Sequence, residues 1–373
     1  MYWRREFLRK SKAMSLGSTY KVDLPDHGLL GSIMFMMTGT GISGYLQTEI
    51  KDRILDYITK IEIVANGSIV IKSISGQELN ALMTYDQGVA GIDYWHDYTG
   101  TKWCHLLMNF GRKFFDREYG LDLSKWNNVE IKITNDGNSD AFSGNFALTV
   151  ELFLKEEDVS GFVGYFKTEE WRSYTTTQSE TKYLELPVEN KIRRIMVQLL
   201  PAYKNGDIVK TNMFNLAHNL KFSLFTGKLV VFDGYSMELA YENYLDMGKD
   251  YITSRMSNKS DGQGFNIGLG RALGGAWGAG QMGAAAGTTV PNMIGRNTDQ
   301  TQEVATRETE ILIQSLWKGF CPENTLLIPF NRIDDPGEYL DPEAKKTVQI
   351  DIFTRGIDDC DDGTVNVVLD RLV

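Results

Sequence analysis

The chain has 373 residues and a formal net charge of −10, a length that accommodates two domains of ordinary size. Its three cysteines, Cys104, Cys321 and Cys360, are widely spaced and include no CxxC pair, which argues against a disulfide framework and against a structural zinc site. Aromatic, β-branched and glycine residues are abundant and proline is scarce, so we expect a mostly β protein rather than a helical bundle. The absence of a long apolar run predicts no cleavable signal peptide and no membrane-spanning segment.

The first 18 residues are interpreted as a basic arm on an otherwise acidic chain. Residues 1–12 carry five basic side chains and one glutamate, which leaves about −14 on the remainder. Aromatic side chains one helical turn apart, with basic side chains along another face, predict a short amphipathic helix. Docking on anionic lipid headgroups and packing on the same or a neighbouring subunit fit this arm equally well. The candidate contact residues are Trp3, Arg4, Arg5, Phe7, Arg9, Lys10 and Lys12.

Short alternating runs separated by turn residues predict a first β-sandwich over residues 19–158. The apolar run Leu29–Met37 indicates a buried strand. Lys60–Ile74 indicates two strands joined at Asn66 and Gly67, because Asn-Gly between alternating runs is a strong hairpin signal. Further strands of this unit are expected at His105–Phe110, Val129–Thr134 and Phe146–Leu154.

A second β-sandwich is expected over residues 159–373, with an insertion at about 250–317. Residues 155–180 are acidic and polar, and we interpret them as the connection between the two units. The insertion contains the Gly/Ala-rich stretch Gly262–Gly287, which cannot form a core of its own, so we expect it on the surface or at a subunit contact. Its tail, Thr301–Trp317, fits a helix or a strand. The expected strands of this unit are Tyr183–Leu186, Lys191–Leu200, Asn219–Phe225, Lys228–Phe232, Leu326–Phe330, Thr347–Thr354 and Thr364–Leu372.

Two runs are the strongest candidates for a chemical site. Asp358, Asp359, Asp361 and Asp362 crowd one predicted turn, where several carboxylates suit Ca²⁺, although the spacing is not that of an EF-hand and a solvated acidic turn is the simpler interpretation. The run from Asp93 to Tyr98 mixes aromatic rings with carboxylates, which suits a sugar-binding loop or a subunit contact equally. No phosphate-binding loop and no clustered metal ligands are present, so we expect no cofactor and no enzymatic activity.

The C-terminal half repeats the pattern of the N-terminal half in the same order. Matching residues from Gly67 to Asp86 recur from Gly227 to Asp246 at an offset of 160. The element Arg-x5-Glu-Tyr at Arg112–Tyr119 recurs at Arg332–Tyr339, and Leu-Asp follows it in both copies. Duplication of one β-domain explains this pattern best. A feature kept in both copies is more typical of a loop anchor than of a reaction centre.

The basic arm, the two tandem β-sandwich units and the insertion in the second unit resemble the double jelly-roll major capsid proteins of tailless icosahedral viruses with an internal membrane. The resemblance covers Tyr20–Val373 and rests on this architecture and on strand phrases such as Tyr57–Gly67 and Gly363–Val373. It implies an all-β fold of two tandem eight-stranded antiparallel jelly rolls. It also implies trimers with a pseudo-hexagonal outline, which tile an icosahedral shell.

The same resemblance implies the partners and location of the chain. The partners would be two further copies in a homotrimer, neighbouring capsomers, penton and minor capsid proteins, and the viral membrane through the N-terminal arm. The protein would be made in the host cytoplasm and reside in the virion, without sequence-specific nucleic-acid binding. The alternatives are a minor virion component with the same fold, and a secreted carbohydrate-binding or glycan-cleaving protein, against which the odd number of cysteines counts.

Overall fold

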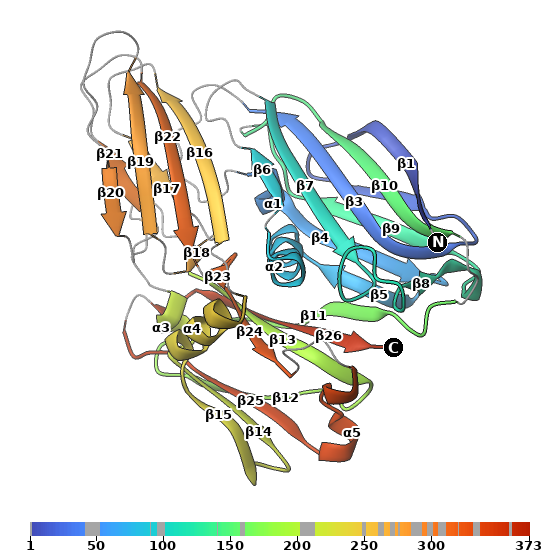
Figure 1. Cartoon of the computed structure of the whole chain (residues 1–373). Coiled ribbons are helices and arrows are strands. Elements are labelled where there is room, and N and C mark those ends of the chain that lie inside the picture. The colour runs from blue at the N-terminus through green and yellow to red at the C-terminus, as the bar shows by residue number, and fades with distance from the viewer. Residues whose placement is uncertain are drawn as a thin grey trace.

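The fold is described from a computed structural model and is built mostly from strands (Figure 1). Two β-sandwich lobes follow one another along the chain, and a smaller sheet comes from the insertion in the second lobe. No helix in the described part of the chain is long and apolar enough to span a membrane. The described residues are 2–41, 53–89, 91–94, 101–139, 141–156, 161–201, 213–247, 251–259, 265–268, 273–274, 277–284, 293–296, 301–304, 311–319, 321–330, 336–357 and 360–373.

The first lobe packs two sheets face to face. One sheet has the order β1 (Tyr2–Met14), β10 (Phe146–Glu156), β3 (Leu29–Thr40), β7 (Thr101–Asn109) and β6 (Ile92–Tyr94), with β8 (Leu121–Asp122) beside β3. The facing strands are β2 (Thr19–Asp23), β9 (Val129–Asn135), β4 (Ile58–Ala65) and β5 (Ile69–Ile74). Buried and less buried residues alternate along β9, as expected for a strand with one face on the core. Helices α1 (Ile54–Tyr57) and α2 (Gly76–Gln87) flank the hairpin of β4 and β5.

The second lobe has the same strand order. Its first sheet runs β11 (Phe166–Thr175), β26 (Thr364–Leu372), β13 (Lys191–Leu200) and β24 (Thr325–Pro329). The facing sheet runs β12 (Thr181–Glu185), β25 (Val348–Phe353), β14 (Asn219–Leu224) and β15 (Leu229–Tyr235). Its helices are α3 (Met213–Leu216), α4 (Ser236–Met247) and α5 (Pro342–Lys345). The short strand β23 (Cys321–Pro322) precedes β24.

The duplication inferred from the sequence is confirmed at the level of single elements. Helices α2 and α4 both have 12 residues and begin 160 residues apart. The preceding hairpin turns place Gly67 at φ +76 and Gly227 at φ +79, a backbone conformation that favours glycine. The side chains of Asp122 and Asp341, which belong to the repeated Leu-Asp element, each cap the helical turn that follows.

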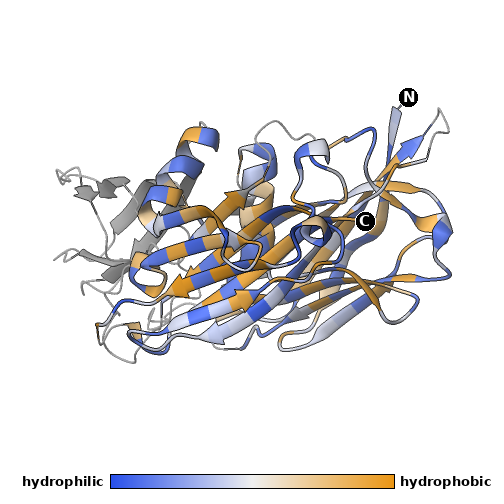
Figure 2. Ribbon diagram, turned by 90° about the horizontal axis from the view of Figure 1, so that it is seen from below, coloured by the Kyte–Doolittle hydropathy of each residue, from blue (hydrophilic) through white to orange (hydrophobic). Residues whose placement is uncertain are grey.

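Two clusters of buried apolar side chains form the cores. Figure 2 shows apolar and polar residues following one another along the strands of both lobes. The larger core belongs mainly to the first lobe but also contains Met196, Leu327 and Val368 from strands of the second lobe. The two lobes therefore share packed side chains.

The predicted N-terminal helix is wrong, because Tyr2–Met14 form strand β1. This strand lies antiparallel to β10, from Tyr2 opposite Glu156 to Met14 opposite Phe146. Register irregularities after Phe7 and after Arg9 break the alternation of period two, which hides the strand in the sequence. Pairing with the edge of β10 supplies backbone hydrogen bonds along the strand, and these outweigh the weak helical pattern.

The predicted connection over residues 155–180 is also wrong in part, because it contains β11. The predicted boundary near Val159 falls in residues 157–160, which lie outside the described part. In the insertion, β16 (Tyr251–Lys259), β22 (Ile311–Gly319), β19 (Trp277–Ala284) and β20 (Met293–Arg296) form one sheet, drawn in orange in Figure 1. Thr301–Val304 forms strand β21, so the segment left open between helix and strand is a strand where it is described.

Candidate assembly surface

The two lobes meet at a seam where a strand from each pairs with the other. Strand β5 of the first lobe lies parallel to β11 of the second, with Lys72 opposite Thr168 and Ser73 opposite Glu169. This pairing joins two four-stranded sheets into one sheet of eight strands (Figure 1). Helix α2 lies over the same seam, where Tyr85 Oη donates a 2.7 Å hydrogen bond to the backbone carbonyl of Thr325.

Buried charges from both lobes form a hydrogen-bonded group at the seam, which we call the seam cluster (Lys72, Asp86, Thr168, Arg193, Arg194 and Asp370). Lys72 Nζ donates to Thr168 Oγ1 at 2.6 Å, and Thr168 Oγ1 donates to Asp370 Oδ1 at 2.8 Å. Arg194 Nε donates to Asp370 Oδ2 at 3.0 Å, and its Nη2 donates to Asp86 on α2. Buried charges are tolerated only when paired in this way.

Burial and electrostatic pairing act in opposite directions on the pKa values in the seam cluster. Burial lowers the pKa of Lys72 to about 8, although the nearby Asp370 and Asp86 carboxylates act in the opposite direction. Burial alone would raise the pKa of Asp370, but the guanidinium groups of Arg194 and Arg193 outweigh it and lower the pKa. Asp370 therefore stays ionised as the acceptor for Arg194.

A second buried ion group joins the lobes through Arg53. Its guanidinium binds Glu323 of the second lobe through two hydrogen bonds of 2.9 and 2.8 Å, and it binds Asp56 at 2.6 Å. Asn80 on α2 also donates to Glu323, at 2.6 Å. Burial would raise the pKa of Asp56, but the adjacent Arg53 outweighs it and lowers the pKa to about 2. The seam is thus fixed by specific polar contacts as well as by apolar packing.

One contact across the seam disfavours the ionisation of a buried carboxyl group. Glu78 on α2 is fully buried, and its Oε2 accepts a 2.7 Å hydrogen bond from the backbone N–H of Ser75. Burial raises the pKa of Glu78 to about 8, and the facing Glu170 carboxylate on β11 raises it further.

Because the folded-state pKa of Glu78 is raised, its ionisation destabilises the fold as the pH rises from about 4.5 towards 8. Replacing Glu78 with glutamine should therefore stabilise the protein by roughly 1–3 kcal/mol at pH 7 and change little at pH 4. Urea unfolding at the two pH values measures this difference. Glu242→Gln, an exposed position on α4, is the matched control and should change stability little at either pH. A gain that is equal at pH 4 and pH 7 would contradict this account.

In the first lobe, β5 and α2 form a face that the second lobe covers. Their repeat counterparts in the second lobe, β15 and α4, form a face that is exposed. Ile71 on β5 is 0 % exposed, whereas its counterpart Val231 on β15 is 55 % exposed. Ala81 on α2 is 0 % exposed, whereas its counterpart Tyr241 on α4 is 60 % exposed. We call this surface the β15–α4 face. Its exposed apolar residues are Leu229, Val230, Val231, Met237, Tyr241 and Leu245.

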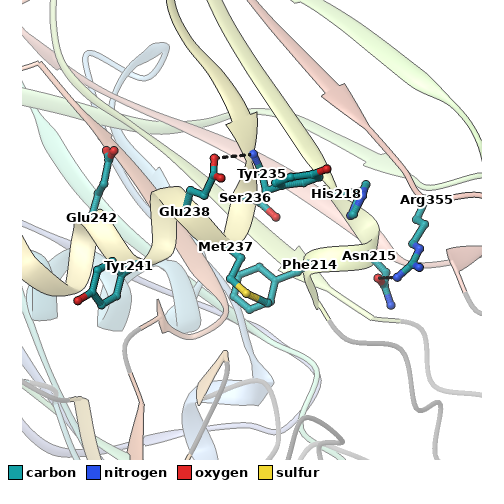
Figure 3. A pocket seen from close by; sticks show the side chains of 10 residues that line it. All are labelled: Phe214, Asn215, His218, Tyr235, Ser236, Met237, Glu238, Tyr241, Glu242 and Arg355. Atoms are coloured by element: carbon teal, nitrogen blue, oxygen red, sulfur yellow. Dashed lines mark hydrogen bonds between the residues drawn. The ribbon is translucent and has the colours of Figure 1, made fainter.

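A hollow of about 1000 Å³ lies at one end of the β15–α4 face (Figure 3). Phe214, Met237 and Tyr241 supply apolar lining, and Figure 3 shows Glu238 and Glu242 projecting from the opposite side of α4 to Met237 and Tyr241. Glu238 Oε2 accepts a 3.2 Å hydrogen bond from the backbone N–H of Tyr235. Apolar side chains that lie together with the charged Glu238, Glu242 and Arg355 suit a protein contact surface with a polar rim.

Three residues of the predicted arm are held by the first lobe itself. The ring of Trp3 lies 5.4 Å from that of Phe115, and it covers Gly31 so closely that a Cβ there would clash. Arg4 Nε donates to Glu156 at 2.7 Å, and Arg5 Nε donates at 2.7 Å to the buried Glu151. These contacts bind β1 to its lobe.

The remaining arm residues face outwards. Phe7 is 51 % exposed, and Lys10 Nζ lies 5.5 Å from the centre of its ring. Arg9, Lys10 and Lys12 are exposed, and none of the three forms an ion pair with another described residue. The structure therefore divides the predicted contact residues into an anchored group and an exposed group.

The two other candidate sites are described only in part. Asp358 and Asp359 lie outside the described residues, while Asp361 Oδ1 accepts a 2.7 Å hydrogen bond from the backbone N–H of Gln178. Among the described residues no three His, Cys, Asp or Glu side chains gather as metal ligands would. Of the Asp93–Tyr98 run, only Asp93 and Tyr94 are described, within β6. Calcium binding at the acidic turn stays a prediction.

Sequence reasoning missed the residues that join the lobes. Arg193 and Arg194 lie next to the apolar run of β13, and two adjacent charges beside such a run were a signal of buried ion pairs. Asp86 was recognised only as part of the repeat. Glu323 stands alone in the sequence, and only the fold brings it to Arg53.

The chain was compared with known families, sequences and solved structures, and only the solved structures show a similarity. No protein-family model and no curated protein matches the sequence. The major capsid protein of Sulfolobus turreted icosahedral virus superposes with a TM-score of 0.63 at 11% identity, covering 100% of this chain and 97% of that one. The major capsid protein of bacteriophage PM2 superposes with a TM-score of 0.52 at 10% identity, covering 100% and 98%. The chain has the double jelly-roll fold of these viral major capsid proteins.

Proposed function

We propose that this chain is the structural major coat protein of an icosahedral virus and acts as a homotrimer. The observation that carries the proposal is the superposition, over the full length of the chain, on proteins named as viral major capsid proteins. Their identity to this chain is low, so the physical features of the chain have to support the role independently.

The duplicated lobe supplies that support. One lobe covers the β5 and α2 face of the other, while the equivalent β15–α4 face is open. A face that binds a lobe within the chain, repeated on the next lobe, gives a head-to-tail contact, and such contacts form a ring when the rotation between successive lobes closes. Three two-lobed chains give a ring of six similar lobes, which is a pseudo-hexagonal tile for an icosahedral facet.

The finer features of the coat role follow from the same proposal. The shell would enclose an internal membrane, and the trimer would contact neighbouring capsomers, penton proteins and minor capsid proteins. Of the predicted membrane-facing arm, Lys12 is an exposed cation, without an ion pair to another described residue, that would meet anionic headgroups. The chain would reside in the virion and perform no catalysis.

The composition of purified particles tests the coat role. In particles of the virus that encodes this chain, we expect the chain to be the most abundant protein on a stained gel and by quantitative mass spectrometry. A low copy number, comparable with that of a vertex protein, would assign it to a minor component instead. Its absence from particles would remove the proposal.

A further inference from the structure

Two edge strands of the chain are the repeat counterparts of the two strands that pair at the seam. Strand β1 ends one sheet of the first lobe, and β15 ends one sheet of the second. Their counterparts are β11 and β5, which pair in parallel between the lobes. Among the described residues neither β1 nor β15 has a partner on its outer side. An unpaired edge strand is a template for pairing with another chain.

We propose that β1 of one copy pairs in parallel with β15 of a second copy and packs on its β15–α4 face. The contact repeats between chains the seam that joins the two lobes within each chain. This inference rests on the proposed coat function, and it names the surfaces that would hold the trimer together.

The register of the contact on the β1 side follows from comparing two strand pairs, β1 with β10 in the first lobe and β11 with β26 in the second. Thr168 lies opposite Asp370, and Phe7 lies opposite Glu151, which is the repeat counterpart of Asp370. Phe7 therefore takes the place of Thr168. In the same way Glu169 lies opposite Leu369, and Arg9 lies opposite Val150, the counterpart of Leu369. Arg9 takes the place of Glu169.

The register on the β15 side follows from the offset of 160 between β5 and β15. Lys72 and Ser73, which face Thr168 and Glu169 at the seam, correspond to Phe232 and Asp233. The contact between copies therefore places Phe7 opposite Phe232 and Arg9 opposite Asp233. An exposed aromatic ring meets a second aromatic ring, and an exposed cation meets an exposed carboxylate.

The charges of the wider surfaces agree with this register. Glu78 faces Glu170 at the seam, and its counterpart on the open face is Glu238. Lys10, next to Arg9, adds a second exposed cation to this edge. The exposed cations of β1 and the carboxylates of α4 gain partners, while the exposed apolar residues of the β15–α4 face become covered.

Site-directed crosslinking tests the register. With Arg9→Cys and Asp233→Cys in one chain, a short bismaleimide should link neighbouring copies, giving dimer and trimer bands on a denaturing gel. The three natural cysteines are buried. Thr19→Cys with Thr134→Cys is the positive control, because these residues lie opposite each other at the surface on β2 and β9 and should be linked within one chain without raising the mass. Lys21→Cys with Asp233→Cys is the negative control, since Lys21 is exposed on β2, which ends the other sheet of the first lobe.

Charge reversal separates this inference from the coat function itself. Arg9→Asp and Asp233→Arg should each raise the dissociation constant of the trimer about tenfold, and the double variant should restore it. A trimer that is indifferent to these changes and gives no crosslink above the negative control would overturn the inference and leave the coat function standing. An unmodified protein that stays monomeric would remove both. A variant that keeps the trimer but loses binding to phosphatidylglycerol vesicles would assign Arg9 to lipid and overturn the inference.

Discussion

Replacing Arg194 with methionine should lower the free energy of unfolding by about 3–5 kcal/mol, because the change leaves buried carboxylates without their main partner. Arg194 is 5 % exposed and donates to both Asp86 and Asp370. Asp86 and Asp370 belong to different lobes and are themselves 3% and 2% exposed at their side chains. Arg193 contacts the same two carboxylates only at 3.3 and 3.4 Å, so it compensates in part.

Urea unfolding followed by tryptophan fluorescence measures the effect of Arg194→Met. Arg117→Met is the matched control, because Arg117 is exposed, and its loss should cost less than about 0.5 kcal/mol. Equal stabilities of the two variants would show that the seam cluster contributes nothing beyond packing.

Replacing Phe166 with alanine should destabilise the protein by about 3–5 kcal/mol, because it removes a fully buried ring at the point where the two lobes meet. Phe166 is 1 % exposed and lies between the tyrosines of the repeated Arg-x5-Glu-Tyr element. Its ring centre is 5.5 Å from that of Tyr119 and 6.0 Å from that of Tyr339. The Arg193 guanidinium lies 4.8 Å from the same ring.

Differential scanning calorimetry of Phe166→Ala is the measurement. Tyr183→Ala removes an aromatic ring that is 70 % exposed, and it should leave the melting temperature almost unchanged. If Phe166→Ala had the same melting temperature as the parent protein, the three rings would not be a structural contact between the lobes.

The strands that bury a continuous apolar run within one lobe were predictable from the sequence. Lys191–Leu200 and Thr364–Leu372 were predicted with the bounds that β13 and β26 have, since Asn190 and Pro201 bound the first run and Gly363 precedes the second. The Asn66–Gly67 hairpin was predicted for the same reason. The duplication could be recognised in the sequence because polar residues, and not only apolar ones, recur at a constant offset in the two halves.

Elements whose environment comes from the other lobe were not predictable. Helix α2 buries Gln77, Glu78 and Asn80 near the seam. Its sequence therefore lacks the separate polar and apolar faces that mark an amphipathic helix. The sequence of strand β11 is typical of a polar linker, because Thr168 hydrogen-bonds to charged side chains from distant parts of the chain. Only the assembled fold brings these partners together.

The arm shows how a local pattern misleads when the chain continues into a sheet. Trp3 and Phe7 are spaced as on one helix face, yet in β1 Trp3 packs on the lobe and Phe7 points outwards. Recognising β1 as the counterpart of β11 required the strand register. This correspondence also turns a suspected membrane arm into a candidate edge for subunit pairing.

The mass of the purified protein in solution, measured by multi-angle light scattering, tests the central claim most directly. A chain of 42.1 kDa that forms the proposed ring of six lobes should elute as a stable species of about 126 kDa, the mass of three copies. A single species of 42.1 kDa at every concentration tested would contradict the account.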